Sequence, residues 1–277
     1  MSNQRSDMLD GLQAAVIAES QSKNKENDLG YKFDPLMMYF REDYYVKGIR
    51  IVQPTIGDIL ELGESKFYSE LSPFLYNSTS IRVALWESPQ RIDWCQVKDI
   101  EVFGMLKNMQ PDAPAIRLLF PDYRIEKMKL IPIKNKNSDD IQLCLYDKAN
   151  NFVLEEADYN QIAEYIRTLL NIHPKVEKAK GKITKQWMID EDKMNMAQKE
   201  NRETSTLLPL ISACINHPGF KYRLQELKNV GIYEFMDSVQ RLQIYESTHA
   251  LMGGSYSGFC DTSKVPKEQF NFMREIK

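Results

Sequence analysis

The strongest constraint on the fold is a long amphipathic pattern near the C-terminus, from Gly231 to Met252. Large or apolar side chains recur there at steps of three and four residues, which places them on one face of a helix. They are Ile232, Phe235, Met236, Val239, Leu242, Tyr245, His249 and Met252. Because glycine adopts the left-handed conformation that often ends a helix, we expect Gly253 and Gly254 to stop it. The pattern predicts a central helix that docks on the rest of the chain.

Two other segments have the pattern of helices that would pack against this one. Thr55 precedes an apolar-periodic run and Asp58 follows three residues later, which is the pattern of a capping box. The run from Leu207 to Ile215 is almost wholly apolar and predicts a buried helix. Residues 204–277 are therefore expected to form a helical region that packs with residues 31–110.

Strand signals are confined to two places. The alternation in residues 44–52, with Lys47 and Gly48 at its middle, predicts a tight hairpin. Between residues 115 and 155, four short apolar or alternating runs are separated by polar turns, which predicts a small antiparallel sheet of about four strands. The expected fold class is α+β: a mainly helical globular domain with this sheet and a short N-terminal hairpin.

Composition divides the remainder of the chain into segments. Residues 1–30 are polar except around Leu12–Ala18, and they predict a mobile N-terminal arm or an arm that becomes ordered on a partner. Residues 31–172 hold the hairpin, several helices and the sheet. Residues 173–203 are rich in charge and predict a linker that includes an exposed helix.

The 277-residue chain has a net charge of −3, so its overall charge does not favour nucleic acid or anionic membrane. No stretch approaches the roughly 18 apolar residues of a membrane span, and the N-terminus lacks the apolar core of a signal peptide. We therefore expect a cytoplasmic protein. Its four cysteines and three histidines are scattered without the short spacings of a zinc site, so neither a metal nor a cofactor is expected.

The sequence contains no catalytic motif. It has no phosphate-binding GxxxxGK loop followed by Ser or Thr, no GxSxG nucleophile turn and no HExxH pair. Asp190, Glu191 and Asp192 are consecutive, so on a helix they point in different directions and do not gather around a cation. No catalytic residue is assigned, and an enzyme is the last choice among the function classes.

The candidate binding residues are therefore contacts for a macromolecular partner. Apolar side chains of the N-terminal arm, the segment before the hairpin and the charged region are assigned to such contacts: Leu12, Val16, Met37, Met38, Trp187 and Met188. Lys178, Lys180 and Lys182 belong to a basic cluster around Gly181 that could contact a polyanion or an acidic partner segment. A solvated linker explains the same lysines, because no aromatic stacking pattern accompanies them.

Two segments of the chain have distinctive patterns. The first is IRIVQPTIGDILELGESKFYSEL at residues 49–71, where a short hairpin leads into a helix of the pattern QPTxGDIxExGExxFY. The second begins with NHPGFKYRLQELKNVGIYEFMDSVQ at residue 216 and closes with FNFMREI. Both segments resemble proteins encoded in the tail-module gene neighbourhoods of phages of low-GC Gram-positive bacteria, which look like tail assembly chaperones. The expected sheet at residues 115–155 takes no part in the resemblance.

The resemblance implies a non-enzymatic tail assembly chaperone that binds apolar helical segments of the tape measure protein in the bacterial host cytoplasm. It implies partners among the phage tail proteins, and self-association as a further expectation. Two alternatives stay open. A structural component of the virion, such as a tail or connector protein, would be present in purified particles. A nucleic-acid accessory protein would use the lysine cluster and would bind with a strong dependence on salt.

Overall fold

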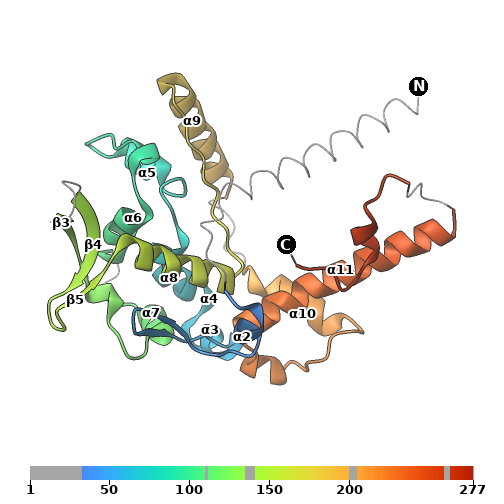
Figure 1. Ribbon diagram of the computed structural model, residues 1–277. Coiled ribbons are helices and arrows are strands. Elements are labelled where there is room, and N and C mark those ends of the chain that lie inside the picture. The colour runs from blue at the N-terminus through green and yellow to red at the C-terminus, as the bar shows by residue number, and fades with distance from the viewer. Residues whose placement is uncertain (1–32, 110–111, 135–140, 200–204, 259–262, 277) are drawn as a thin grey trace.

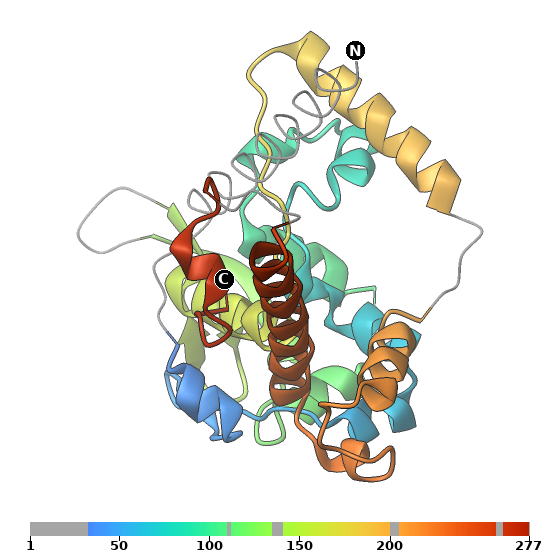
Figure 2. The same ribbon diagram turned by 90° about the vertical axis from the view of Figure 1, so that its right-hand side faces the viewer.

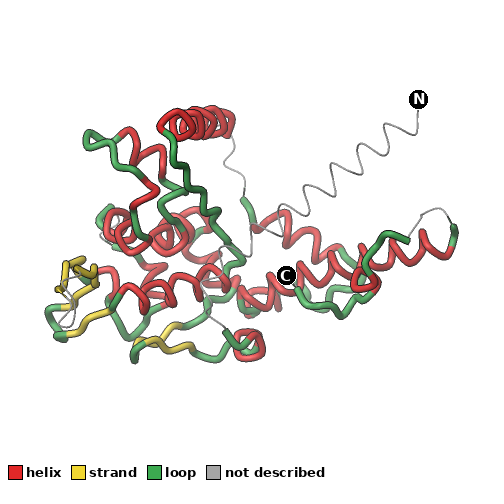
Figure 3. The backbone as a smooth tube through the Cα atoms, turned by 45° about the horizontal axis from the view of Figure 1, so that its top comes forward, coloured by secondary structure: helices red, strands yellow, loops and turns green. Residues whose placement is uncertain are grey.

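The structure is a computed structural model that describes residues 33–109, 112–134, 141–199, 205–258 and 263–276. Within these ranges the protein is mainly helical and carries two small antiparallel sheets, which confirms the α+β class. Figure 1 shows the larger sheet at one end of the molecule and helix α11 extending from the other, with helix α9 standing away from the body. In Figure 3 the strands lie at the margins of the helical body.

The described elements follow one another along the chain without internal repetition. In order they are α2 (Pro35–Tyr39), β1 (Tyr44–Val46), β2 (Ile49–Ile51), α3 (Ile56–Leu62), α4 (Glu64–Leu75), α5 (Arg82–Glu87), α6 (Asp99–Lys107), α7 (Pro114–Leu119), β3 (Lys129–Lys134), β4 (Ile141–Asp147), β5 (Phe152–Leu154), α8 (Glu156–Leu169), α9 (Lys182–Lys199), α10 (Leu207–Asn216) and α11 (Ile232–Tyr256). Short 3-10 turns lie at Trp94–Gln96, Ile125–Lys127, Glu226–Asn229 and Lys267–Phe270.

Helix α4 lies at the centre of the main body. Phe67, Leu71 and Phe74 recur at steps of four and three residues, and all three are fully buried. Helices α3, α6, α7 and α8 pack around this helix. The ring of Phe74 lies 5.0 Å from that of Phe103 in α6 and 6.3 Å from that of Tyr159 in α8. Helices α4, α6 and α8 are therefore in contact through these three aromatic rings.

Carboxylates of α4 cap the starts of two other helices. The first backbone N–H groups of a helix have no partner within it, so they need an acceptor from elsewhere. Glu70, which is 5% exposed, accepts a 2.7 Å hydrogen bond from the N–H of Ala115 at the start of α7. Glu64 accepts from the N–H groups of Thr206 and Leu207 at the start of α10, at 2.7 and 3.0 Å. Helix α4 therefore fixes where both helices begin.

The carbonyl groups at the end of α4 are paired by side chains of α8. Tyr159 donates its hydroxyl to the carbonyl oxygen of Pro73 at 3.0 Å. Arg167 donates to the carbonyl oxygens of Phe74 and Tyr76 at 2.9 and 3.1 Å, and its guanidinium also lies 2.9 Å from a carboxylate oxygen of Asp99. A cation at a helix C-terminus is favourable because the last carbonyls carry partial negative charge. Residues of α8 thus pair acceptors that would otherwise be buried without a partner.

The hairpin expected over residues 44–52 is confirmed. Strand β1 pairs antiparallel with β2, and the two residues between them, Lys47 and Gly48, have φ values of 49° and 85°. Two consecutive positive φ values are typical of a type I′ turn, whose twist matches that of the flanking strands. Ile49 and Ile51 are buried on one face of the hairpin, as the alternation predicts.

The larger sheet has three strands, in the order β3-β4-β5, and every neighbouring pair is antiparallel. The first of the four expected strands, at residues 115–120, is instead helix α7 with its C-terminal residue. Pro114 occupies the first turn of this helix, where a missing N–H removes no intrahelical bond. Glu70 of α4 then supplies an acceptor for the Ala115 N–H. Because that acceptor comes from another element, the local pattern of residues 115–120 could not reveal the helix.

Helix α11 differs from its expected form in two ways. It runs through Gly253 and Gly254 to Tyr256, and the glycine with a left-handed φ, 72°, is Gly258. Ile232 and Phe235 in its first turn are fully buried, whereas Tyr245 is 37% exposed. The helix is docked at its beginning and extends away from the body, so it is not the central helix of the fold (Figure 1).

Helix α10 is also less buried than its apolar sequence predicts. Leu207 and Cys214 are buried, but Leu208 is 65% exposed. The helix contacts α11 along one side, and Glu64 holds its first turn. An apolar composition therefore does not place this helix in the interior, because only one of its faces meets the body.

The C-terminal region joins the rest of the chain through a short backbone bridge. The N–H of Ile56 donates to the carbonyl of Val230, and the N–H of Ile232 donates to the carbonyl of Pro54, both at 3.0 Å. Gly57 lies beside this bridge. A Cβ atom on Gly57 would lie 2.7 Å from the carbonyl oxygen of Lys228, which is a backbone atom and cannot rotate away.

We expect Gly57→Ala to destabilise the protein by about 1–3 kcal/mol, because the added methyl group forces the bridge apart. Alanine normally stabilises a helix relative to glycine, so the test is whether Gly57→Ala lowers the free energy of unfolding instead of raising it. Gly253→Ala is the matched control: it lies in α11 with nothing within 4 Å of an added Cβ. That variant should stabilise by roughly 0.5–1 kcal/mol in urea unfolding. If both changes altered the free energy of unfolding by the same amount, the close contact between Gly57 and the bridge would be refuted.

Candidate partner-binding site

Helix α9 belongs to a satellite of the main body that has its own small core. We call residues 173–181 the strap, and the strap together with α9 the α9 arm. The arm packs against α5 and the turn at Trp94–Gln96. Leu85, Trp94 and Ile189 form a buried cluster separate from the main core. Figures 1 and 2 show α9 beside α5 and outside the main body.

A buried arginine fastens the arm. Arg82 at the start of α5 is 5% exposed, and its guanidinium meets two carboxylates of the arm. One nitrogen lies 2.6 Å from Glu177 of the strap, and another lies 2.7 Å from Asp192 of α9. The pairing with Asp192 uses two nitrogens and both carboxylate oxygens, which is the strong, directional form of this interaction. The hydrogen bonds of Asp192 and Glu177 raise the pKa of Arg82 above its ordinary value, against the opposing effect of burial.

Further polar contacts hold the same face of the arm. Lys185 of α9 pairs with Asp93, and Lys193 pairs with Glu87 at the end of α5. The indole N–H of Trp94 donates to the carbonyl of Glu177 at 3.0 Å. The arm is therefore attached by ion pairs and hydrogen bonds around a small apolar cluster, in which partly buried side chains pack on three buried ones. An attachment of this kind is weaker than docking on a large core, because it buries less apolar area.

The opposite face of α9 carries an apolar stripe directed to solvent. Ile183 is 87% exposed, Trp187 is 65% exposed and Met194 is 62% exposed. Their spacings of four and seven residues place them along one line of the helix. Ile189, which is fully buried, lies on the other side. Helix α9 thus packs Ile189 against the rest of the protein on one face and presents a longer apolar stripe to solvent on the other.

The residues assigned from sequence are distributed over separate parts of the molecule. Leu12 and Val16 lie outside the described residues. Met37 is 51% exposed in α2, but Met38 beside it is 3% exposed and packs in the main core, so Met38 cannot contact a partner. Its burial follows from the helical period, because only one face of the five-residue α2 meets the body.

The two assigned residues of α9 face different ways. Trp187 belongs to the exposed stripe, whereas Met188 is half-buried against the cluster of Leu85, Trp94 and Ile189. Consecutive residues of a helix are rotated by about 100°, so a partner that covers Trp187 does not reach Met188 equally well. Lys178, Lys180 and Lys182 are all exposed at the start of the arm, so the arm brings them into the same satellite as Trp187.

A second apolar patch lies on α2. Leu36 is 65% exposed and Phe40 is 68% exposed. Asp34 caps this helix by accepting from the N–H of Leu36 at 2.9 Å, and Pro35 starts it. The resulting helix turns these two side chains outward while Met38 points inward. This patch and the α9 stripe are on different elements and are two separate surfaces.

Sequence analysis missed Ile183 and the role of Arg82. A signal for the stripe was present, because Ile183, Trp187 and Met194 share one helical face while Ile189 lies on another. Two apolar faces on one charged helix indicate contacts on both sides. For Arg82 no local signal exists, because its partners Glu177 and Asp192 lie about a hundred residues further along the chain.

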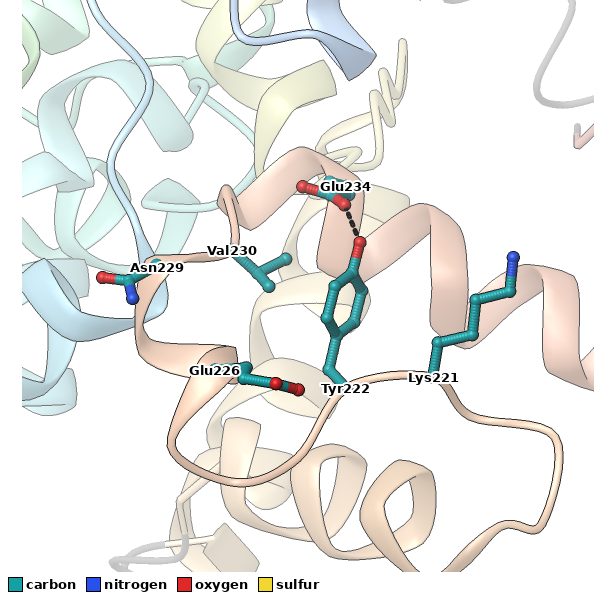
Figure 4. A pocket seen from close by; sticks show the side chains of 6 residues that line it. All are labelled: Lys221, Tyr222, Glu226, Asn229, Val230 and Glu234. Carbon is teal, nitrogen blue, oxygen red and sulfur yellow. Dashed lines mark hydrogen bonds between the residues drawn. The ribbon is translucent and has the colours of Figure 1, made fainter.

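An open hollow of about 480 Å³ lies beside the start of α11. Figure 4 shows Tyr222 and Glu234 facing one another across it, while Lys221 lies apart from this pair. The hydrogen bond to Glu234 raises the pKa of Tyr222 to about 12. Glu226 accepts from the backbone N–H of Arg223 at 2.8 Å. Since these lining groups already bind each other or the backbone, the hollow does not present them to a ligand.

The rings of His217 and His249 have structural contacts. The Nδ1 atom of His217 accepts from the N–H of Gly219 at 3.0 Å, so its Nε2 is the atom that donates to Glu246 at 2.9 Å. His249 stacks on Tyr245 with ring centroids 4.2 Å apart. Across the described ranges, no three His, Cys, Asp or Glu side chains are grouped closely enough to hold a metal ion. Among the described helices, none has the length and apolar character needed to cross a membrane.

Comparison with known proteins gives no relative: the chain matches no protein-family model, no curated protein and no solved structure.

We expect Arg82→Ala to release the arm while the main body stays folded. The change removes the shared partner of Glu177 and Asp192 and should cost the arm roughly 1.5–3 kcal/mol, the range for a lost hydrogen bond between charged groups. All three tryptophans, Trp86, Trp94 and Trp187, lie in the arm or its base, so tryptophan emission reports on this satellite alone. The emission should shift to longer wavelength at a denaturant concentration at which far-ultraviolet circular dichroism still shows a folded body.

The matched control for this change is Arg50→Ala. Arg50 also pairs with two carboxylates, Asp43 and Asp122, but its side chain is 38% exposed. Its removal should have little effect on stability and leave tryptophan emission unchanged, because exposed ion pairs contribute little. Coincident unfolding of arm and body in Arg82→Ala would show that the satellite is not a separate unit.

Acid should weaken the attachment of the arm. The hydrogen bond from Lys185 holds the pKa of Asp93 below its ordinary value. A lowered folded-state pKa contributes stability that is complete above the unfolded value of about 3.9 and is lost as the pH falls through the folded value. Tryptophan emission of the wild-type protein should therefore shift to longer wavelength below about pH 4. Lys185→Met removes the hydrogen bond that lowers the pKa of Asp93. The arm of this variant should therefore be less stable at pH 7 and should lose less stability on acidification. The same acid response in variant and wild type would refute this assignment.

Proposed function

We propose that this protein is a non-catalytic binding protein whose α9 arm presents an apolar stripe to helical segments of a partner. The exposure of Ile183, Trp187 and Met194 on the outer face of α9 is the observation that carries the proposal. The stripe offers apolar area and no reactive group, so binding is the function that it supports.

The physical argument rests on the cost of leaving these side chains in water. Transferring a large apolar side chain out of water contributes about 1.5–3 kcal/mol. Tryptophan and methionine are also common at interfaces, because tryptophan supplies a large rigid area and methionine adapts to irregular surfaces. A helix with an apolar line at steps of four and seven residues matches the apolar line of another amphipathic helix. A partner helix laid along α9 would remove all three side chains from water at once.

The resemblance of residues 49–71 and of the C-terminal segment supports a more specific partner. It supports assignment of the protein to the tail assembly chaperones of phages of low-GC Gram-positive bacteria. The partner helices would then belong to the tape measure protein, a long chain that needs to be kept soluble before the tail forms. Binding would take place in the cytoplasm of the bacterial host.

Co-expression with the tape measure protein of the same tail gene cluster tests this function. The wild-type protein should raise the soluble fraction of the tape measure protein, and Trp187→Ala should lose most of that increase. Leu208→Ala is the matched control, because Leu208 is also 65% exposed but lies on α10. Both substitutions remove an exposed side chain, so neither should change the unfolding transition of the main body.

Two outcomes would reject the proposal. An unchanged solubility of the tape measure protein in the presence of the wild-type chain would remove the chaperone function. Mass spectrometry of purified particles gives the second: the chaperone should be absent, and its presence in stoichiometric amount would favour the structural virion protein instead.

A further inference from the structure

The charges of the α9 arm are distributed unevenly along its length. Lys178, Lys180 and Lys182 are exposed at its beginning, and within the described ranges none of them forms an ion pair. Lys185 and Lys193, by contrast, pair with carboxylates of the arm's base. The first turn of α9 and the end of the strap therefore present three positive charges to solvent.

The strap's contacts explain why two of these lysines point outward. Glu177 accepts the indole N–H of Trp94 and pairs with Arg82, and Ala179 exchanges hydrogen bonds with the thiol of Cys95 at 3.4–3.5 Å. Successive side chains of an extended segment alternate between its two sides. Lys178 and Lys180 alternate with these two anchored residues, so their exposure is built into the attachment of the strap.

The middle of α9 carries the opposite charge. Asp190 and Glu191 are exposed, and Asp190 accepts a 2.9 Å hydrogen bond from Gln186, one turn earlier in the helix. Asp192 points toward the body and is held by Arg82. On the outer side, the arm thus runs from three lysines, past Ile183 and Trp187, to two acidic groups beside Met194.

We infer that the α9 arm binds an amphipathic helix that has a cluster of acidic residues at the end lying on Lys178, Lys180 and Lys182. The apolar face of that helix covers Ile183, Trp187 and Met194, and a basic residue further along it meets Asp190 and Glu191. This inference rests on the proposed function and adds to it the chemistry and the direction of the partner. The apolar stripe gives the contact, and the charge gradient sets which end of the partner lies on the strap.

A second copy of the chain does not fit these charges. An antiparallel pair of α9 helices that joins Ile183 to Met194 of the other copy places Lys182 opposite Asn195, which is uncharged. A parallel pair places lysine against lysine.

A nucleic acid fits the lysines but not the remainder of the stripe. Its phosphates would continue along the arm toward Asp190 and Glu191, where like charges repel. The stripe also holds one aromatic side chain, Trp187, whereas a strand of bases is usually bound on several. The observations therefore favour an acidic-ended helix, and a single-stranded oligonucleotide serves as the counter-probe.

A double-mutant cycle on the full-length protein tests the inference. The probe is a synthetic fluorescein-labelled helical peptide with leucines at steps of three and four, three glutamates in its first turn and lysines in its second half. Its mate has glutamine at the three glutamate positions. The protein variant carries Lys178→Gln, Lys180→Gln and Lys182→Gln, and its matched control carries Lys127→Gln, Lys129→Gln and Lys148→Gln, which remove the same charge near the three-stranded sheet.

Fluorescence anisotropy at low salt should show that either change alone weakens binding by about fivefold and that both together weaken it no further, since they remove one interaction. The control variant should bind like the wild-type protein. The fivefold difference should shrink toward onefold near 1 M salt, where the screening length falls to about 3 Å.

Three results would overturn the inference. Losses that multiply to about 25-fold would show that the lysines and the glutamates do not meet. An oligonucleotide that binds more tightly than the acidic peptide, with a loss in the lysine variant but none in Trp187→Ala, would assign the lysines to nucleic acid. The third is that the wild-type protein fails to bind the acidic peptide. Loss of tape measure solubilisation in Trp187→Ala would leave the proposed function standing in each case, so the two failures can be told apart.

Discussion

The constraint on which the main body depends is the need to find hydrogen-bond donors for the last carbonyl groups of helix α4. Its final carbonyls are buried among other helices, and an unpaired buried acceptor costs about 1–3 kcal/mol. Tyr159 and Arg167 of α8 satisfy them, and Arg167 also reaches Asp99 at the start of α6. Glu64 in the first turn of α4 and Glu70 in its middle provide acceptors for the first N–H groups of α10 and α7. Four helices are thus positioned by polar contacts around α4, and the apolar packing alone would leave their rotation and register open.

The α9 arm repeats this arrangement on a smaller scale and with a different result. Arg82 follows α4 closely in the chain and binds two carboxylates of the arm, beside a small apolar cluster in which Leu85, Trp94 and Ile189 are buried. An arm held by a few ion pairs and a small apolar cluster can leave most of its helix in water, since its attachment uses one face only. That arrangement explains how a protein with an ordinary core presents Ile183, Trp187 and Met194 to solvent without losing the helix that carries them.

The same geometry connects the proposed binding function with its direction. The strap is tied to the body through Glu177 and Ala179, which directs the lysines between and beside them outward. Of the acidic residues in the middle of α9, Asp192 binds Arg82 of the body, whereas Asp190 and Glu191 face solvent. Attachment and recognition therefore use alternate residues of one segment. A change that weakens the attachment of the strap should also leave the lysine side chains without a fixed position relative to the acidic residues of α9.

The sequence by itself determined those features whose cause is local. The hairpin follows from Lys47 and Gly48 between alternating residues, and the start of α3 follows from the reciprocal bonds of Thr55 and Asp58. The exposed charged helix at 182–199 could also be predicted, because its composition offers little to a core. Tertiary structure decided everything whose cause lies far away in the chain. Glu70 of α4 supplies an acceptor at the start of α7, the docking of α11 buries only residues near its beginning such as Ile232 and Phe235, and Arg82 holds the face of α9 that carries Asp192 against the body. A pattern of apolar residues shows which faces a helix has, but only the positions of distant charged partners decide which of those faces is left in water.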